Sequence, residues 1–187
     1  PVIFYTGQGN EKTAREAFIR GASDYFPKDI FGFAHKEKFL FSIKRAIETA
    51  RTRKVVEETQ ERLRAVIETA RDPIFIKDKK GSFIVINPAF EILAGKSRDE
   101  IIGKNYDEVF GEFVDPDVIK RNSIYDQATL EGNITEDNVT KYTNTGVKHY
   151  HTIKVPLKNS KGEINGICGI ARDITQVKEA RDALKKS

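Results

Sequence analysis

Apolar positions follow two different periods along the chain, and each period predicts a different kind of element. Residues 1–6 and 22–28 are short apolar runs bordered by glycine, which is typical of buried strands. Between them, apolar side chains recur at helical spacing until a glycine ends the run. A strand, a helix and a second strand in this order predict a parallel strand pair, as in α/β proteins.

The next segment, residues 36–71, is predicted to form one long helix. It contains no proline and no glycine, and it is dense in Glu, Lys, Arg, Ala and Leu, which favour helix. Aliphatic side chains recur along it at heptad-like spacing, a pattern typical of helices that pair with another helix. Asp72 and Pro73 end the helix, because the residue before a proline is pushed out of the helical conformation.

After Pro73 the pattern changes to short strands and short helices. Two apolar, β-prone runs flank a turn-rich spacer and predict an antiparallel hairpin. Asp115 and Pro116 suit the N-cap and the first position of a longer helix. The order of these elements predicts a compact α+β domain. Strands are expected at residues 74–77, 83–87, 138–142, 148–157 and 163–171, and helices at 88–94, 98–102, 116–130 and after residue 173.

Composition narrows the class of protein. Of the 187 residues, 39% are hydrophobic and 32% are charged, which is typical of a folded chain of one or two domains. Lys and Arg exceed Asp and Glu by 32 to 28, and because this excess is spread along the chain, we expect no nucleic-acid partner. Apolar runs are far shorter than the ~20 residues of a membrane-spanning helix. We therefore expect no membrane association and, with a single cysteine, a cytoplasmic location.

Residues 63–178 carry several residues in a distinctive order. They are Asp72-Pro73-Ile74 at the end of a helix, Asp78 and Gly81 in the first hairpin, Asn87 followed by Phe90, and the closing run Arg172-Asp173-Ile174-Thr175. This order resembles that of a PAS domain. The resemblance implies a PAS fold over residues 72–176, with a five-stranded antiparallel sheet and short helices, after a helical linker at 51–71. It also implies an output helix from 177 to 187 and a signal-transfer junction formed by Asp173, Ile174 and Thr175.

Residues 1–50 have a second resemblance, which rests on Thr6, Lys28 and the run from Gly21 to Tyr25. They resemble the C-terminal part of a response-regulator receiver domain, an α/β fold. The resemblance implies that Thr6 and Lys28 contact a phosphoryl group and that Tyr25 acts as a rotamer switch. The family's phosphoacceptor aspartate and metal-binding acidic pair would lie upstream of Pro1, so we expect an incomplete receiver segment. The family's usual Lys-Pro pair reads Lys28-Asp29 here.

Signals for catalysis, metals or cofactors are few. The chain has no HExxH and no CxxC motif, so we expect no metal site, and it has no catalytic constellation. Flavin-binding PAS domains resemble one another in a cysteine on the central helices, and haem-binding ones in a histidine on the long helix; this chain has neither there, so both cofactors are disfavoured. A ligand pocket between the long helix and the sheet is one hypothesis, and an ordinary packed core is the other. The candidate lining is Ile86, Phe90, Ile119, Tyr125, Ile153 and Cys168.

These observations predict a sensory and relay segment of a cytoplasmic two-component phosphorelay protein, whose parent chain continues into a histidine kinase. The alternative is a PAS module that binds no ligand and serves dimerisation and signal transmission. A homodimer is expected in both cases. Asp173 is expected to cap the final helix, or to pair with a cation such as Lys77 or Arg172.

Overall fold

The structure is a computed structural model that describes residues 2–6, 11–27, 33–143 and 146–186. It divides into two compact units, Pro1–Leu63 and Arg64–Ser187, which share the long helix α2 (Phe33–Thr69). The prediction of one uninterrupted helix in this region is confirmed. Within the described ranges, no helix combines the length and the apolar character that crossing a membrane requires.

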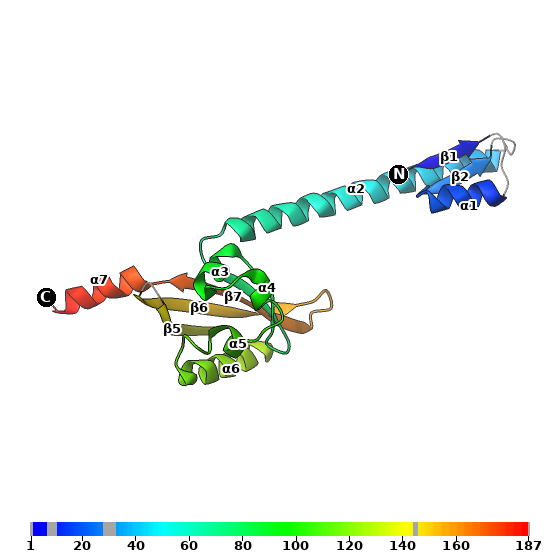
Figure 1. Cartoon of the computed structure of the whole chain (residues 1–187). Helices are drawn as coiled ribbons and strands as arrows, with labels where there is room; N and C mark the ends of the chain where they lie inside the picture. Colours follow the sequence, from blue (N-terminus) through cyan, green and yellow to red (C-terminus); the bar gives the residue numbers. More distant parts are fainter. Residues whose placement is uncertain (1, 7–10, 28–32, 144–145, 187) are drawn as a thin grey trace. The chain divides into compact units, whose positions relative to one another are not determined.

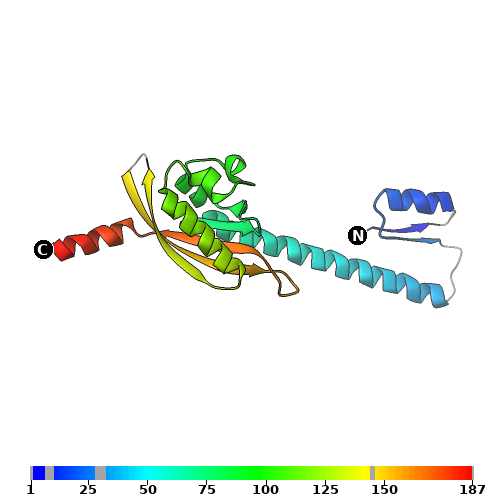
Figure 2. The same ribbon diagram turned by 90° about the horizontal axis from the view of Figure 1, so that it is seen from below.

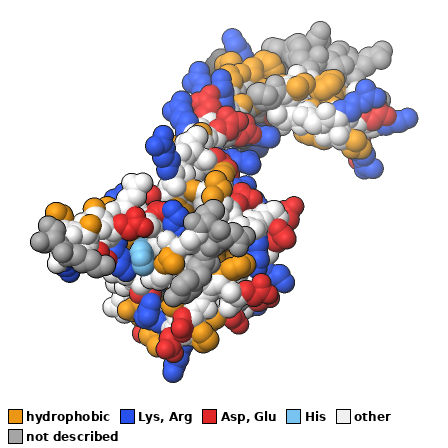
Figure 3. All heavy atoms as spheres, turned by 60° about the vertical axis from the view of Figure 1, so that its left-hand side comes forward, with side chains coloured by type: hydrophobic (Ala, Val, Ile, Leu, Met, Phe, Trp, Pro, Cys, Tyr) orange, Lys and Arg blue, Asp and Glu red, His pale blue; other side chains and the backbone are white. Residues whose placement is uncertain are grey.

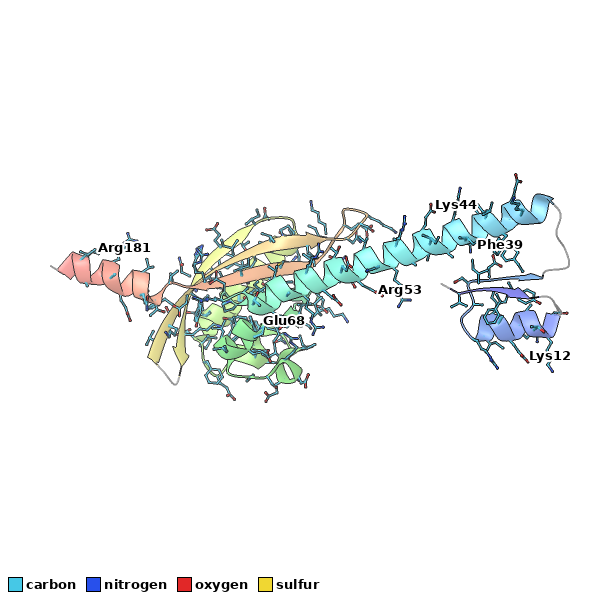
Figure 4. The ribbon with its side chains drawn as sticks, turned by 90° about the horizontal axis from the view of Figure 1, so that it is seen from above. Lys12, Phe39, Lys44, Arg53, Glu68 and Arg181 are labelled. Atoms are coloured by element: carbon cyan, nitrogen blue, oxygen red, sulfur yellow. The ribbon has the colours of Figure 1, made fainter. Side chains whose placement is uncertain are left out.

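The N-terminal unit contains a strand pair. Strands β1 (Ile3–Thr6) and β2 (Asp24–Pro27) pair in parallel and are connected through α1 (Glu11–Ile19), so the predicted parallel pairing is confirmed. The ring of Phe39 on α2 packs edge-on against that of Phe26 on β2, with 5.1 Å between the ring centroids (Figure 4). An aromatic contact therefore joins α2 to this strand pair.

The second unit is built on a five-stranded sheet with the strand order β4-β3-β7-β6-β5. Every neighbouring pair of strands is antiparallel, which confirms the predicted PAS-type α+β fold. The strands are β3 (Ile74–Asp78), β4 (Phe83–Ile86), β5 (Thr135–Thr143), β6 (Gly146–Lys158) and β7 (Ile164–Asp173). The helices are α3 (Pro88–Ala94), α4 (Arg98–Ile101), α5 (Tyr106–Phe110), α6 (Pro116–Leu130) and α7 (Thr175–Lys186).

The two faces of this sheet have different surroundings. Helices α3 to α6 cover one face, which we call the inner face (Figure 1), and α6 is laid across it (Figure 2). Four phenylalanine rings from both layers form the centre of the core, with 5.0 to 5.8 Å between neighbouring centroids. The inner face carries Phe75, Lys77, Val139, Lys141, Tyr150, Thr152 and Lys154, and the outer face carries Ile74, Ile76, Ile153, Val155, Cys168 and Ile170.

Gly169 occupies an inward position of β7, directly beneath the ring of Phe75. A Cβ atom at residue 169 would overlap the ring atoms of Phe75. Because glycine has no side chain, the ring can approach the strand backbone and join the aromatic core. This position therefore needs glycine for space rather than for an unusual backbone conformation.

Side-chain caps start several helices of the second unit. The Asp115 carboxylate accepts a hydrogen bond from the amide of Asp117, and Pro116 follows it, as predicted. Helix α5 was not predicted from apolar spacing. It begins with a capping box in which Asn105 and Glu108 bond each other's backbone amides. The Asn-x-x-Glu spacing is the sequence signal that identifies this short helix.

Candidate functional site

A small cavity of about 30 Å³ lies between the inner face of the sheet and the helices. Six aromatic residues form much of its wall, and most of its polar groups come from β5, β6 and α6. Its lining consists of Phe75, Phe83, Phe90, Leu93, Tyr106, Phe110, Asn122, Asp137, Val139, Lys141, Tyr150, Thr152, Lys154 and Ala171. The cavity therefore combines an aromatic enclosure with a polar floor.

Three lysines point from the sheet into the interior of this unit. Lys77 on β3, Lys141 on β5 and Lys154 on β6 are only 1%, 5% and 3% exposed. Each occupies an inward position because side chains alternate between the two faces of a strand. Fully buried lysines are rare unless they are paired, so their partners decide what the site can do.

A single carboxylate bridges two of these lysines. The Asp126 carboxylate on α6 accepts hydrogen bonds from Lys77 Nζ and Lys154 Nζ, each at 2.5 Å. Asn122, one turn earlier on α6, accepts a bond from Lys154 Nζ through its side-chain oxygen at 2.7 Å and donates to Asp126 at 3.3 Å. The spacing of four residues places both polar side chains on the helix face that meets the sheet.

Lys141 has a different environment. Its Nζ lies 3.2 Å from the centroid of the Phe110 ring and 5.6 and 5.9 Å from the centroids of Tyr106 and Tyr150. Within the described part of the chain, Nζ makes no hydrogen bond or ion pair. Aromatic faces attract a cation, but they replace only part of the hydration that an ammonium group loses on burial.

Burial shifts the pKa values of groups around the cavity. Loss of hydration, against the attraction of Asp126, lowers the pKa of Lys77 to about 8. Burial and the charge of Lys77 place the pKa of Lys141 well below its ordinary value. Burial also raises the pKa of the Tyr106 hydroxyl, with help from Asp137 and Asp126. Such perturbed groups gathered around a cavity are typical of functional sites.

The predicted pocket residues are divided between several places. Phe90 lines the cavity, whereas Ile86 is buried in the adjoining core. Ile119 packs against that core, and Tyr125 is half-buried on α6 outside the cavity lining. The remaining two, Ile153 and Cys168, lie on the outer face of the sheet, where they line a separate depression.

The difference follows from strand and helix periodicity. On β6, the residues that enter the cavity are Tyr150, Thr152 and Lys154, so Ile153 lies on the opposite face. On α6, the buried residues are Val118 and three polar ones, Asn122, Asp126 and Thr129. Sequence reasoning missed the lysines, Asn122 and Asp126 because it looked for apolar lining. Polar residues at helical spacing, facing lysines at alternate strand positions, are the signal that identifies them.

The predicted signal-transfer junction lies where β7 meets α7. The Asp173 carboxylate accepts a hydrogen bond from the Thr175 amide at 2.9 Å and so caps α7. The Thr175 hydroxyl in turn accepts a bond from the His149 amide on β6, and the Ile174 amide donates to the His149 carbonyl. The start of α7 is therefore bonded directly to two strands of the sheet.

The cation beside Asp173 is Lys148, at 3.7 Å. The two cations predicted as partners of Asp173 have other partners. Lys77 binds Asp126, and Arg172 pairs with Asp72. Burial alone would raise the pKa of the Asp173 carboxyl, but hydrogen bonds from Thr175 and the charge of Lys148 together lower it.

The end of α2 is fixed to the same end of the sheet. The buried Asn87 side chain donates to the carbonyls of Ile67, Ala70 and Asp72, and its oxygen accepts from the Ile74 amide. Its oxygen also caps α3. In the antiparallel β3–β7 pair, the first residues of β3 lie beside the last residues of β7. The C-terminal end of α2 and the start of α7 therefore lie at the same end of the β3–β7 pair.

Two ion pairs hold the end of α2 and the residues that follow it. Arg98 pairs with Glu68, which Figure 4 labels near the end of α2, at 3.0 Å. Arg172 on β7 pairs with Asp72 just after α2, at 3.3 Å. The second pair connects the chain entering the sheet with the strand that leads to α7.

The receiver-like residues lie in the N-terminal unit. Thr6 ends β1 and Tyr25 lies in β2, on the neighbouring parallel strand. Within the described residues, the buried Tyr25 hydroxyl has no hydrogen-bond partner. Lys28 and the side chain of Thr6 lie outside the described residues.

Charge at the surface is arranged differently from charge in the cavity. On the face drawn in Figure 3, acidic and basic side chains intermingle. Within the described residues, no group of three or more His, Cys, Asp or Glu side chains is placed to hold a metal ion.

Comparison with known proteins gives relatives for about two thirds of the chain. The chain is 36% identical over 129 residues to the methanogenesis regulatory histidine kinase FilI of Methanothrix harundinacea, covering 68% of this chain and 14% of FilI. It is 25% identical over 127 residues to the aerobic respiration control sensor protein ArcB of Escherichia coli, covering 67% of this chain and 16% of ArcB. The chain thus spans a small part of the length of these relatives.

Comparison with solved structures also finds a similar fold. The PAS domain of a protein from Colwellia psychrerythraea matches with a TM-score of 0.53 at 20% identity, covering 63% of this chain and 98% of that domain. The sequence profile of the PAS fold matches residues 61–174, which include all five strands, the cavity and the residues that fix the end of α2. On this evidence, the chain belongs to the PAS family.

Proposed function

We propose that this chain is the sensory and relay segment of a multidomain two-component signalling protein. The cavity takes up a small ligand, the sheet transmits the change to residues 173–175, and α7 carries it to a downstream output domain. The names of FilI, a histidine kinase, and of ArcB, a sensor protein, support a kinase as that output. The small volume of the cavity favours a ligand much smaller than flavin or haem.

The observation that carries this proposal is the register between β6 and β7. Tyr150, which lines the cavity, lies directly opposite Asp173, which caps α7. Lys148, two residues away on β6, lies opposite cavity residue Lys141 on β5 and pairs with Asp173. A displacement of these strand positions by a ligand would therefore reach the cap of α7 without an intervening loop.

The proposal predicts that Asp173→Ala in the full-length parent protein changes kinase output in the basal or the stimulated state. Loss of an N-cap typically costs ~0.5 to 2 kcal/mol, which loosens the junction without unfolding the domain. Autophosphorylation with and without stimulus measures the output, and thermal unfolding measures the stability of the domain.

Asp99→Ala is the matched control, because Asp99 is an exposed aspartate on α4, away from the junction. We expect this control to leave output unchanged. Unchanged output of Asp173→Ala in both states would rule out the relay role. Altered output accompanied by a large loss of thermal stability would assign the effect to folding instead.

The alternative function is a dimerisation module that binds no ligand. Exposed apolar residues on α7, Val177 and Leu184, stand one heptad apart and favour pairing of this helix with a second copy. We expect a homodimer in either case. A module that only dimerises would gain thermal stability with protein concentration and would respond to no small molecule, whereas a sensor responds to both.

For the N-terminal unit we retain the resemblance to the C-terminal part of a receiver domain as a proposal. The parallel strand pair with Thr6 and Tyr25 on neighbouring strands supports it. In this proposal residues 1–50 belong to a phosphorelay protein but carry no phosphoacceptor aspartate of their own. Treatment with a small phosphodonor should therefore leave no acid-labile aspartyl phosphate in residues 1–50, and mass spectrometry would detect one.

A further inference from the structure

Cationic side chains outnumber carboxylates in the interior of the PAS domain. The buried cations are three lysines, Lys77, Lys141 and Lys154, and the carboxylates that face them are two, Asp126 and Asp137. Asp126 is shared by two lysines, and Asp137 is bound by Arg121 at 3.0 Å. Both carboxylates are therefore already paired with other cations, and neither neutralises Lys141.

The unpaired ammonium group of Lys141 is directed to the cavity. Lys141 is one of the lining residues, and its nearest group is the ring of Phe110 rather than an acceptor. A buried ammonium group that lacks a hydrogen-bonding partner is costly, and folded proteins rarely retain one. An acceptor supplied from outside would remove this cost.

The size and wall of the cavity limit what that acceptor can be. A volume of about 30 Å³ corresponds to roughly two water molecules, because one water needs ~10 to 15 Å³ measured in this way. Tyr150 and Thr152, which both carry a hydroxyl group, line the cavity together with Lys141, and phenylalanine rings complete the wall. A flat group of a few heavy atoms with one negative charge and a short apolar part matches these surroundings.

We propose that the cavity binds a small monocarboxylate, with Lys141 Nζ as its principal hydrogen-bond donor and the aromatic wall around its apolar part. The inference deepens the proposed function, because it names the chemical class that the sensory cavity takes up. A planar carboxylate fits better than inorganic phosphate, whose four oxygens and higher charge exceed the space and the one free cation that the described cavity offers.

Binding should be accompanied by proton uptake. A carboxylate next to Lys141 favours the charged ammonium form, whereas burial in the free protein disfavours it. The titratable and charged groups that face Lys141 are Lys77 from β3, Tyr106 from α5, Asp126 and Arg121 from α6, and Tyr150, Lys154 and Lys148 from β6, with Asp137 beside it on β5. The carboxylates in this set are already paired, so the incoming anion changes the protonation of Lys141 most.

The test is calorimetric titration of the 187-residue chain with sodium formate and sodium acetate at constant ionic strength. Sodium chloride and sodium phosphate serve as comparison anions. We expect saturable binding of the carboxylates alone. At pH 8, repetition in buffers of different ionisation enthalpy should show uptake of up to about one proton per carboxylate bound.

Two lysine variants decide whether the anion is bound where we propose. Lys141→Met keeps the length of the side chain but removes the charge, and should weaken binding by on the order of tenfold to a hundredfold. Lys120→Met makes the same change at an exposed position on α6 and should bind like the unmodified chain. If Lys141→Met does not fold, the proton uptake of the unmodified chain decides, because surface binding of an anion moves no such proton.

Absence of carboxylate binding, equal binding by Lys141→Met, or equal binding of chloride or phosphate would each overturn the proposal. These results are independent of the output measurement. Binding that depends on Lys141 while Asp173→Ala leaves kinase output unchanged would support the anion site and contradict the relay. Altered output in Asp173→Ala without carboxylate binding would support the relay and contradict the anion site.

Discussion

The inner face of the five-stranded sheet buries lysines beside its aromatic core, whereas the outer face exposes large apolar side chains. The inner face, covered by helices, buries three lysines, whereas the outer face leaves Ile153 and Ile170 at 39% and 45% exposure. Hydrophobic residues in a core and charges at a surface need no special explanation, but the reverse arrangement does. Both faces are formed by the same strands, so the difference between them arises at alternate residues of each strand rather than between whole segments.

The buried lysines support the proposal that the inner face binds a ligand as well as forming the core. Its aromatic cluster would make a stable core without any lysine, and an apolar replacement of a buried ion pair is often neutral or stabilising. Retaining Lys77, Lys141 and Lys154 there therefore points to a role in binding. The apolar outer face, by contrast, is built like a surface that another element or another chain can cover.

Asp126→Ala, on the inner side of the sheet, should cause the largest loss in the free energy of unfolding. It leaves Lys77 and Lys154 buried without their shared carboxylate, and breaking a buried pair in this way typically costs ~3 to 5 kcal/mol. Unfolding by urea, monitored by circular dichroism, measures the change. As a control, Asp72→Ala breaks the exposed pair with Arg172 and should cost below about 1 kcal/mol. Equal effects of the two variants would show that the inner lysines do not depend on Asp126.

A smaller loss of stability should distinguish the two faces of strand β7. Gly169→Ala places a methyl group against the Phe75 ring on the inner face and should destabilise the domain by ~1 to 3 kcal/mol. Cys168→Ala, the neighbouring residue on the outer face, should cost less because its site is open and half-buried. Urea unfolding of both variants compares them, and a larger loss for Cys168→Ala would contradict the assignment of the faces.

The pH dependence of stability should report the buried lysines. Between pH 8 and 9 the unfolded chain keeps Lys77 and Lys141 protonated, whereas the folded chain has released part of these protons. The unfolded state then binds more protons, so the free energy of unfolding should rise with pH, by about 1 to 2 kcal/mol over this interval. Cys168, whose pKa burial raises, opposes this trend at higher pH. A flat profile that Lys141→Met leaves unchanged would contradict it.

Much of the fold could be predicted from the sequence, because its signals are local. Pro116 after Asp115 fixed the start of α6, and glycine turns separated the strands. The cavity was harder to predict, because its members come from β3, β5, β6 and α6 and meet only through strand register. The prediction placed Ile153 in the wall of the pocket, but Ile153 lies on the outer face of the sheet. Its neighbours Thr152 and Lys154 line the cavity on the inner face. A lysine in a strand is ordinarily exposed to solvent, so the local sequence pattern does not identify Lys141 as buried.

The most direct test of the carboxylate site is the pKa of the Lys141 ammonium group, measured by NMR of the side-chain Nζ with and without sodium acetate. In the free chain, burial predicts a pKa well below the ordinary lysine value, and acetate should raise it because a carboxylate then faces the ammonium group. Chloride at the same ionic strength should leave it unchanged. An ordinary pKa in the free chain, or a pKa that acetate and chloride affect equally, would contradict an anion site at Lys141.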